Sequence, residues 1–227
     1  MTTGELAAVF DHTLLRPDAV TGDVDRLCDE ARRFGFHAVC VQPCWVARAA
    51  RALAGSGVAV ASVVAFPHGA STTAVKAAEA ARAVADGATE LDLVANLGWI
   101  RAGDDAAVRD EVAAVVAAAP RALVKVILET TLFSDDRKAA AARAACAGGA
   151  AFVKTSTGFG GGGATVEDVA LLRRAVGPGP GIKASGGIRT RDQAVALLAA
   201  GATRLGASGS VALVGSTGGH APGGRPG

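Results

Sequence analysis

AAFVKTSTGFGGGGATVEDVALLRRAVGPGPGIKASGG, residues 150–187, is the stretch that decides the fold. It opens with a short apolar run, Ala151 to Ser156, that has the length and composition of a strand. A helical segment follows over Val166 to Val176, and a second strand-like run covers Gly181 to Ser185. Strand, helix and strand joined by glycine-rich turns are typical of a βαβ unit with parallel strands. The stretch therefore predicts a parallel sheet with helices packed against it.

The same alternation continues in both directions along the chain. Strands are expected at Phe10 to Leu14, Ala38 to Gln42, Val58 to Phe66, Glu90 to Ala95, Leu123 to Glu129, Ala151 to Ser156, Gly181 to Ser185 and Arg204 to Ala207. Helices are expected at Val24 to Phe34, Trp45 to Leu53, Thr73 to Ala85, Ala106 to Ala118, Asp135 to Ala147, Val166 to Val176 and Arg191 to Ala199. Successive strands start 20 to 33 residues apart, which is the span of one βα unit.

Eight such strands predict an α/β fold, a single (β/α)8 TIM barrel over residues 1–214. An open doubly wound sheet is the alternative, but no GxGxxG turn follows an early strand. Residues 215–227, GSTGGHAPGGRPG, have too little apolar surface to bury, so we expect a disordered tail and assign it no role. In such a barrel the chemistry lies at the carboxyl ends of the strands and in the loops that follow them.

Charge and composition argue against several classes of protein. With 23 basic and 21 acidic residues the net charge is +2, so we expect neither nucleic acid nor a membrane surface as a partner. No apolar run reaches the roughly 18 residues of a membrane span, and the first residues do not resemble a secretory signal. The four cysteines, Cys28, Cys40, Cys44 and Cys146, match no zinc motif. We expect reduced thiols in a cytoplasmic protein.

Lysine is scarce in this chain, and its positions are informative. The five lysines, against 18 arginines, are Lys76, Lys125, Lys138, Lys154 and Lys183. Lys76 and Lys138 fall in helical segments and are expected to be solvated. Lys154 and Lys183 lie near the ends of consecutive strands, 29 residues apart, so both should reach the same mouth of the barrel. Two ammonium groups in one buried site repel each other, which lowers the pKa of one and yields the neutral amine of a nucleophilic lysine.

Other charged residues in apolar strands are candidates for supporting roles. Lys125 is expected to support the site rather than to react, because no hydroxyl-rich or glycine-rich turn follows it. Asp92 lies in the apolar run Leu91 to Val94, and a buried carboxylate opposite lysines is either an ion-pair partner or a proton carrier. Asp11 and Glu129 are further acidic candidates.

Metal binding and thiol chemistry are disfavoured by the sequence. His12 and His68 are each isolated, with no further ligand at metal-binding spacing. Cys40 lies between two valines in a strand, a position typical of core packing. We therefore expect no metal.

Glycine-rich segments follow each of the last three strands. They are Gly158 to Gly163, Gly186-Gly187 and Gly206-Ala207-Ser208-Gly209-Ser210. Main-chain N–H groups exposed by glycine bind anions, and the loops after the last strands of a barrel commonly hold phosphate. Beside candidate Schiff-base lysines, these loops indicate a small phosphorylated carbonyl substrate. Simple flexible turns are the alternative.

These segments together resemble a known family, the deoxyribose-phosphate aldolases. The motifs that carry the resemblance are Asp11-His12-Thr13, Val39-Cys40-Val41, Ala65-Phe66-Pro67-His68-Gly69, Glu90-Leu91-Asp92, VKVILET at 124–130, FVKTSTGF at 152–159 and IKASGGIRT at 182–190. The similarity runs from about Asp11 to Ser210. It implies a class I aldolase, a lyase without metal or cofactor, that reversibly cleaves 2-deoxy-D-ribose 5-phosphate to D-glyceraldehyde 3-phosphate and acetaldehyde. A homodimer is common in this family.

The resemblance also implies roles for individual residues. Lys154 matches the Schiff-base lysine, Lys183 a second lysine that tunes its pKa and transfers protons, and Asp92 an acid that donates and accepts protons. The residues that match the pocket lining are Asp11, Cys40 and Lys125. The residues that match the phosphate site are Gly158, Gly186, Gly187, Ser208 and Gly209. In GASGS, Gly209 stands where some members have a serine, so a main-chain N–H would replace that hydroxyl.

Two other functions fit the same residues. A pyridoxal-phosphate barrel protein also needs a lysine and a phosphate site. A non-catalytic sugar-phosphate sensor would bind the same ligand without turning it over.

Overall fold

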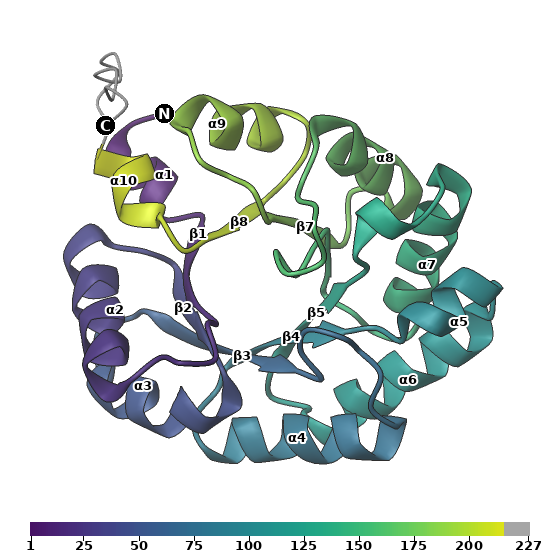
Figure 1. The fold of residues 1–227 in the computed structure, drawn as a ribbon, viewed down its shortest axis with the longest axis horizontal. Helices are drawn as coiled ribbons and strands as arrows, with labels where there is room; N and C mark the ends of the chain where they lie inside the picture. The colour runs from purple at the N-terminus through teal and green to yellow at the C-terminus, as the bar shows by residue number, and fades with distance from the viewer. Residues whose placement is uncertain (216–227) are drawn as a thin grey trace, which may run out of the picture.

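The strands pair in parallel in chain order, and β8 returns to β1, which closes the sheet into a barrel (Figure 1). This is a computed structural model, and it describes residues 1–215. The strands are β1 (Phe10–Leu14), β2 (Ala38–Val41), β3 (Ala59–Val64), β4 (Glu90–Val94), β5 (Leu123–Ile127), β6 (Phe152–Lys154), β7 (Gly181–Ser185) and β8 (Arg204–Ala207). The predicted TIM barrel is confirmed.

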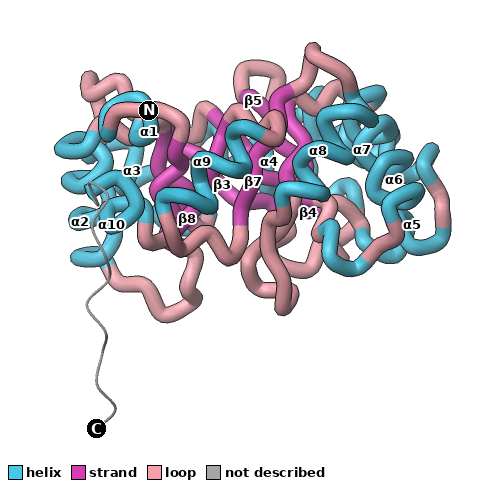
Figure 2. Tube along the Cα trace, turned by 90° about the horizontal axis from the view of Figure 1, so that it is seen from above, coloured by secondary structure: helices cyan, strands magenta, loops and turns pink. Residues whose placement is uncertain are grey.

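Helices surround the barrel in Figure 1, and in the turned view of Figure 2 they flank the strands. They are α1 (Thr3–Ala7), α2 (Thr21–Phe34), α3 (Val46–Ala52), α4 (Thr73–Ala85), α5 (Leu97–Ala102), α6 (Asp105–Ala118), α7 (Asp135–Ala147), α8 (Val166–Val176), α9 (Arg191–Ala199) and α10 (Ser210–Gly215). Two 3-10 turns, η1 (Pro43–Trp45) and η2 (Thr130–Leu132), complete the connections. The expected tail lies outside the described residues, apart from Gly215, which ends α10.

All eight strands and seven helices lie where the sequence predicts them, with differences at their ends. Two short helices, α1 and α5, were not predicted, although both carry helix-start signals. Thr2 and Glu5 form a capping box on α1, and the Asn96 side chain accepts from two backbone N–H groups at the start of α5. The strand β6 is shorter than expected, since the chain turns into the glycine-rich loop after Lys154.

Alternation along the strands separates an apolar outer face from a charged interior. In β4, Leu91 and Leu93 pack with the helices in the main hydrophobic core, whereas Glu90 and Asp92 join the buried charges inside the barrel. The smaller inner apolar cluster contains Leu15, Cys40, Ala61 and Val63. The interior of the barrel is therefore a polar compartment enclosed by an apolar shell.

The expectation that Lys76 is solvated is wrong. Lys76 on α4 is fully buried, with Nζ 2.7 Å from Glu111 Oε1 on α6 and donating to the Val94 carbonyl at 3.0 Å. The neighbouring helix supplies the carboxylate that permits this burial, and the pattern of a single helix does not reveal it. Lys138 is also largely covered, between Asp135 and Asp168.

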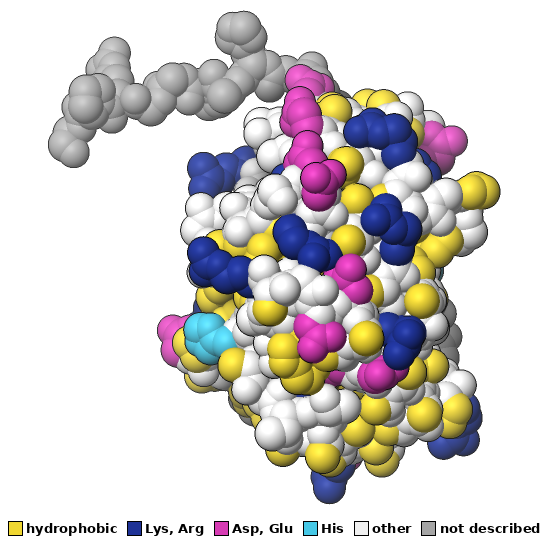
Figure 3. All heavy atoms as spheres, turned by 90° about the vertical axis from the view of Figure 1, so that its right-hand side faces the viewer, with side chains coloured by type: hydrophobic (Ala, Val, Ile, Leu, Met, Phe, Trp, Pro, Cys, Tyr) yellow, Lys and Arg dark blue, Asp and Glu magenta, His cyan; other side chains and the backbone are white. Residues whose placement is uncertain are grey.

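The outer surface carries mixed charge. On the face shown in Figure 3, basic, acidic and apolar side chains are interspersed. Among residues 1–215, no helix is both long enough and apolar enough to cross a membrane.

Candidate active site

Three strands bring Lys154, Lys183 and Asp92 together inside the barrel. Lys154 on β6 and Lys183 on β7 are partners in the sheet register, so their side chains extend side by side. Both ammonium groups reach the same carboxylate oxygen, Asp92 Oδ2, at 2.7 Å each. All three side chains are buried. The sequence prediction that the two strand lysines share one site with Asp92 is met by this geometry.

A second set of charges lies next to this group. Lys125 on β5 is opposite Asp92 in the register and contacts it at 2.9 Å. Asp11 on β1 pairs with Lys183 and lies 3.6 Å from the Lys125 ammonium. Glu90 and Arg204, which were not predicted as site residues, join the same network, with Glu90 2.6 Å from Lys125 and Arg204 2.8 Å from Asp11. The spacing of Glu90 two residues before Asp92 on a strand was a signal that both face inward.

A glycine on β8 makes room for one of the lysines. A Cβ atom at Gly206 would lie 3.0 Å from Lys183 Cε and 3.1 Å from Ser185 Cβ. Such contacts are tighter than ordinary van der Waals packing. Gly206 therefore contributes space for the Lys183 side chain inside the barrel.

The network gives the two lysines different proton affinities. Lys154 holds its proton weakly, whereas Lys183 holds its proton strongly. Burial lowers the pKa of Lys154 below its ordinary value; Lys183 lowers it further, and Asp92 compensates only in part. Burial also disfavours a charged Lys183, yet Asp11 and Asp92 raise its pKa well above the ordinary value. Although burial alone would raise it, the surrounding lysines hold the pKa of Asp92 well below its usual range. Lys154 is thus the lysine that gives up its proton more readily.

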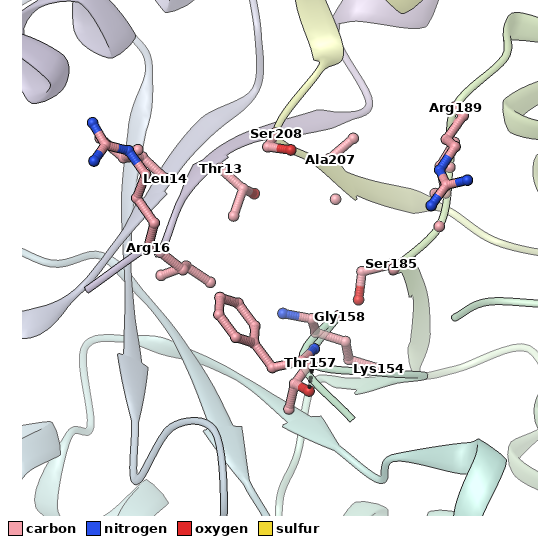
Figure 4. Close-up of a pocket in the computed structure, with 16 residues that line it drawn as sticks. Thr13, Leu14, Arg16, Lys154, Thr157, Gly158, Ser185, Arg189, Ala207 and Ser208 are labelled. Carbon is pink, nitrogen blue, oxygen red and sulfur yellow. Dashed lines mark hydrogen bonds between the residues drawn. The ribbon is translucent and has the colours of Figure 1, made fainter. Parts of the chain in front are cut away.

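A cavity of about 450 Å³ opens above the charges at the carboxyl ends of the strands. Its lining includes Lys154 from β6 and Thr13 and Arg16 from the end of β1 and the loop after it. Figure 4 shows Lys154 and Gly158 on one side, facing Ser208 across the cavity. Within the described residues, Lys154 is therefore the member of the buried charge network that lines this cavity.

Asp11, Cys40 and Lys125, which were expected to line the substrate pocket, lie at the base of the site, and their role there stays a prediction. Within the described residues, none of the three is part of the lining. They lie deeper, where Asp11 and Lys125 take part in ion pairs and Cys40 Sγ is 3.8 Å from Asp92 Oδ2. Their strand positions precede the carboxyl ends, so the cavity-facing residues of the same strands and loops cover them. Burial raises the pKa of the Cys40 thiol to about 11, which leaves it protonated at neutral pH.

The glycine-rich loops form a large part of the cavity wall. Of the residues expected to hold phosphate, the lining includes Gly158, Gly186, Gly187 and Ser208. Gly209 is not part of the lining, because the chain turns away into α10 directly after it. The loops are packed closely together: Ala164 N–H donates to the Gly186 carbonyl at 3.0 Å.

Further lining residues were not predicted. Arg189 follows the Gly186-Gly187 pair and flanks the cavity, opposite Arg16 (Figure 4). Phe159, half exposed, also lines it and packs edge-on against Phe66. An arginine two positions after a glycine pair was a usable signal for an anion site.

Glu129 lies behind the glycine-rich loop rather than in the cavity. It follows β5 with a left-handed backbone and is buried. Its Oε2 accepts from the Thr157 hydroxyl at 2.5 Å and from the Thr157 N–H at 3.2 Å. The Thr157 hydroxyl oxygen accepts in turn from Phe159 N–H at 3.0 Å. Glu129 therefore holds the start of the loop that contains Gly158.

His12 and His68 take no part in the cavity lining. His12 lies outside the barrel, between Glu30 at 2.7 Å and the Ser210 hydroxyl at 3.3 Å. His68 is exposed. In residues 1–215, no cluster of three or more His, Cys, Asp or Glu side chains has an arrangement suited to a metal ion.

Fold and site together define a class of protein. A closed (β/α)8 barrel with a buried lysine in a cavity that glycine-rich loops also line is an enzyme scaffold equipped for lysine-based carbonyl chemistry. The sequence profile of the DeoC/LacD family aldolases matches residues 6–215. The chain belongs to this family of aldolases.

Individual relatives agree with this assignment. A deoxyribose-phosphate aldolase of Brevibacillus brevis is 52% identical over 205 residues, covering 90% of this chain and 93% of the relative. One of Rhodospirillum rubrum is 55% identical over 210 residues, covering 92% and 88%. The structure of the deoxyribose phosphate aldolase from Aeropyrum pernix, described as a unique tetramer, superimposes with a TM-score of 0.89 at 36% identity, covering 94% of this chain and 91% of that one. The predicted resemblance is confirmed.

Proposed function

We propose that this chain is a class I aldolase that reversibly cleaves 2-deoxy-D-ribose 5-phosphate to D-glyceraldehyde 3-phosphate and acetaldehyde. The observation that carries the proposal is the position of Lys154. Among the interior lysines of the described chain it is the one that lines the cavity, and it shares its single carboxylate oxygen with Lys183. A buried amine with a weakly held proton, facing a cavity, is the nucleophile that Schiff-base chemistry requires.

The reaction begins at the aldehyde carbon of the open-chain sugar. The neutral Lys154 amine adds to C1, and loss of water converts the adduct to an iminium ion. The C3 hydroxyl then loses its proton, the C2–C3 bond breaks, and its electron pair moves toward the iminium nitrogen to give an enamine. Glyceraldehyde 3-phosphate leaves as the aldehyde. The iminium ion thus acts as the electron sink that lowers the barrier to carbon–carbon cleavage.

Proton carriers complete the cycle. Protonation of the enamine at C2 regenerates an iminium ion, and addition of water releases acetaldehyde and free Lys154. Asp92 Oδ2 lies 2.7 Å from the reacting Lys154 amine and 2.7 Å from the Lys183 ammonium, so Asp92 and Lys183, together with an ordered water, are the proton carriers. The sequence contains no tyrosine to serve in this role.

The substrate phosphate binds at the glycine-rich wall. Main-chain N–H groups of Gly158, Gly186 and Gly187 and the Ser208 hydroxyl supply hydrogen-bond donors there. Arg189 lines the same side of the cavity and adds a positive charge. Binding the phosphate at this wall leaves the aldehyde end of the substrate free to reach Lys154 in the same cavity.

Reductive trapping tests the proposal. The protein is incubated with acetaldehyde and borohydride, which reduces an imine to a stable ethyl-lysine, and the modified peptide is mapped by mass spectrometry. We expect the adduct on Lys154, none in Lys154→Ala, and normal trapping in Lys138→Ala, a lysine remote from the cavity. Trapping and turnover that persist in Lys154→Ala would contradict the assignment.

The same preparation separates the alternative functions. A pyridoxal-phosphate protein would show the absorbance of its cofactor and need it for activity. A sugar-phosphate sensor would bind the substrate without releasing acetaldehyde. We expect turnover without any added cofactor.

Assembly and location are also part of the proposal. We place the chain in the cytoplasm as a homodimer whose single catalytic domain is the barrel. The tetrameric relative from Aeropyrum pernix makes the assembly a direct question for light scattering coupled to gel filtration. A mass of twice the chain is the expected result, and a tetramer or monomer would contradict it.

A further inference from the structure

Two buried charged residues inside the barrel have no part in the proposed reaction. Arg204 on β8 lies 2.8 Å from Asp11 Oδ1 and 3.2 Å from Glu90 Oε2, and its guanidinium packs over the Phe152 ring. Glu90 Oε2 also lies 2.6 Å from the Lys125 ammonium. Within the described residues, neither Arg204 nor Glu90 lines the cavity. They nonetheless belong to the ion-pair network that ends at Lys154.

The charges in this network do not balance when all its groups are ionised. Four cations, Lys125, Lys154, Lys183 and Arg204, face three carboxylates, Asp11, Glu90 and Asp92, in the part of the chain that the structure describes. His37, a partly exposed residue just before β2, also lies 3.2 Å from Glu90 Oε1, and it adds no negative charge that could offset the excess. The remaining strands, β2 and β3, contribute Cys40 and the apolar Ala61 and Val63. An unpaired charge is costly to bury, so the network favours loss of one proton. Arginine does not give up its proton in proteins, so a lysine must.

The contacts of the three lysines determine which one loses it. Lys125 contacts Glu90, Asp92 and Asp11, at 2.6, 2.9 and 3.6 Å. Lys183 pairs with both Asp11 and Asp92. Lys154 has one contact, Asp92 Oδ2, and shares that oxygen with Lys183. Lys154 is therefore the least stabilised as a cation.

We propose that Arg204 and Glu90 are positioning residues that set the charge balance of the barrel interior and thereby keep Lys154 neutral. Arg204 supplies the excess positive charge. It also forms ion pairs with Asp11 and Glu90, and without Arg204 these two carboxylates would be more available to the lysine ammonium groups. The negative charge of Glu90 has the opposite effect, because it lowers the net positive charge of the barrel interior by one unit. This inference rests on the proposed function, because it gives the neutral Lys154 amine its role as nucleophile.

Removing one charge of each sign tests the inference. Arg204→Met deletes the excess positive charge, so protonated Lys154 is repelled less and its pKa should rise. Glu90→Gln deletes a negative charge at nearly constant shape, so the pKa of Lys154 should fall. For a unit charge on the order of 10 Å away at an effective dielectric constant of about 20, the shift is about one pH unit. The acid limb of the pH profile of kcat/KM should therefore move to higher pH in Arg204→Met and to lower pH in Glu90→Gln.

Two control variants separate charge from structural damage. Arg204→Lys keeps the positive charge, so its acid limb should stay at the wild-type position. Lys76→Met removes a lysine that is equally buried and ion-paired but lies between α4 and α6, and it should leave the limb unchanged. General damage to the fold would lower rates in several variants but would not move the limb in opposite directions.

The rate of borohydride trapping with acetaldehyde, measured across pH, supplies a second readout. Opposite shifts of this profile in Arg204→Met and Glu90→Gln support the inference. Trapping on Lys154 with no shift in either variant, or with shifts of the same sign, overturns it and leaves the proposed function standing. Absence of any adduct in the wild-type protein overturns the proposed function itself. If Arg204→Met does not fold, the expected downward shift in Glu90→Gln decides the question alone.

Discussion

The barrel interior and the cavity mouth are built from opposite kinds of residue. The interior holds long charged side chains on strands, such as Lys154, Lys183 and Asp92, fixed by the sheet register and by ion pairs. The glycine-rich wall of the mouth offers mostly backbone, from Gly158, Gly186 and Gly187, in loops packed against each other. Reactive groups need fixed positions and controlled protonation, whereas an anion can be held by N–H groups that any loop exposes. The comparison predicts that changes in the interior affect turnover and that changes at the mouth affect substrate binding.

The largest effect is expected at Lys154. Lys154→Ala removes the nucleophile, and kcat/KM for 2-deoxy-D-ribose 5-phosphate should fall on the order of 10⁴-fold or more. The melting temperature should not fall, because the substitution removes a buried amine that has one shared partner. A coupled assay for acetaldehyde measures the first quantity and thermal denaturation the second. A Lys154→Ala variant that retains a tenth of the wild-type rate would contradict the assignment of Lys154 as the nucleophile.

Lys183→Leu should cause the next largest loss. Its ammonium repels a proton on Lys154, so its removal raises the pKa of Lys154 and leaves that amine mostly protonated at neutral pH. We expect kcat to fall about 10²- to 10³-fold near pH 7, with partial recovery as the pH rises. The pH profile of kcat is the measurement. Near-normal turnover at neutral pH would remove Lys183 from the mechanism.

Glu129 tests the mouth rather than the interior. Its Oε2 accepts both bonds from Thr157 and so holds the loop that carries Gly158. Glu129→Ala should loosen this wall and raise KM for the phosphorylated substrate about tenfold, with kcat/KM for unphosphorylated 2-deoxy-D-ribose little changed. Glu129→Gln keeps an acceptor oxygen at the same place and should behave like the wild type.

A different pattern would assign Glu129 to the other region. If Glu129→Gln loses kcat on both substrates, its negative charge takes part in the chemistry and Glu129 belongs functionally to the interior. Glu111→Gln, a change at an equally buried carboxylate remote from the cavity, controls for loss of stability. It should leave the preference for the phosphorylated substrate unaltered.

Much of the barrel interior could be predicted from the sequence, because the signal lies within individual strands. A charged residue in an apolar strand is conspicuous, and the spacing of one βα unit placed Lys154 and Lys183 on neighbouring strands. Depth inside the barrel was not predictable in the same way. Whether Asp11 or Lys125 lines the cavity or lies beneath it depends on the register of eight strands and on the loops that cover them, and no single segment contains that information.

Ion-pair partners on distant segments explain the remaining differences between the sequence predictions and the structure. Arg204 opens its strand and resembles a solvated end residue until Asp11 and Glu90 are placed beside it. Lys76 and Glu111 are 35 positions apart on separate helices, so neither helix alone indicates a buried pair. Long-range ion pairs are therefore the part of this structure that local patterns leave open.

The smallest effect on activity is expected at Lys76. This lysine is as deeply buried as those inside the barrel, so it tests whether position inside the barrel, rather than burial, determines the effect on turnover. Its ammonium satisfies Glu111 and the Val94 carbonyl in the helical shell and has no route to the cavity. Lys76→Met leaves the Glu111 carboxylate buried without its cation, so the free energy of unfolding should fall by about 3 kcal/mol. In urea titration the midpoint should drop accordingly, while kcat/KM at 25 °C stays within about threefold of the wild type. The double variant Lys76→Met/Glu111→Leu removes both charges and should regain much of the lost stability. A large loss of turnover in a folded Lys76→Met protein would mean that burial and pairing alone, rather than position inside the barrel, decide which lysines serve the reaction.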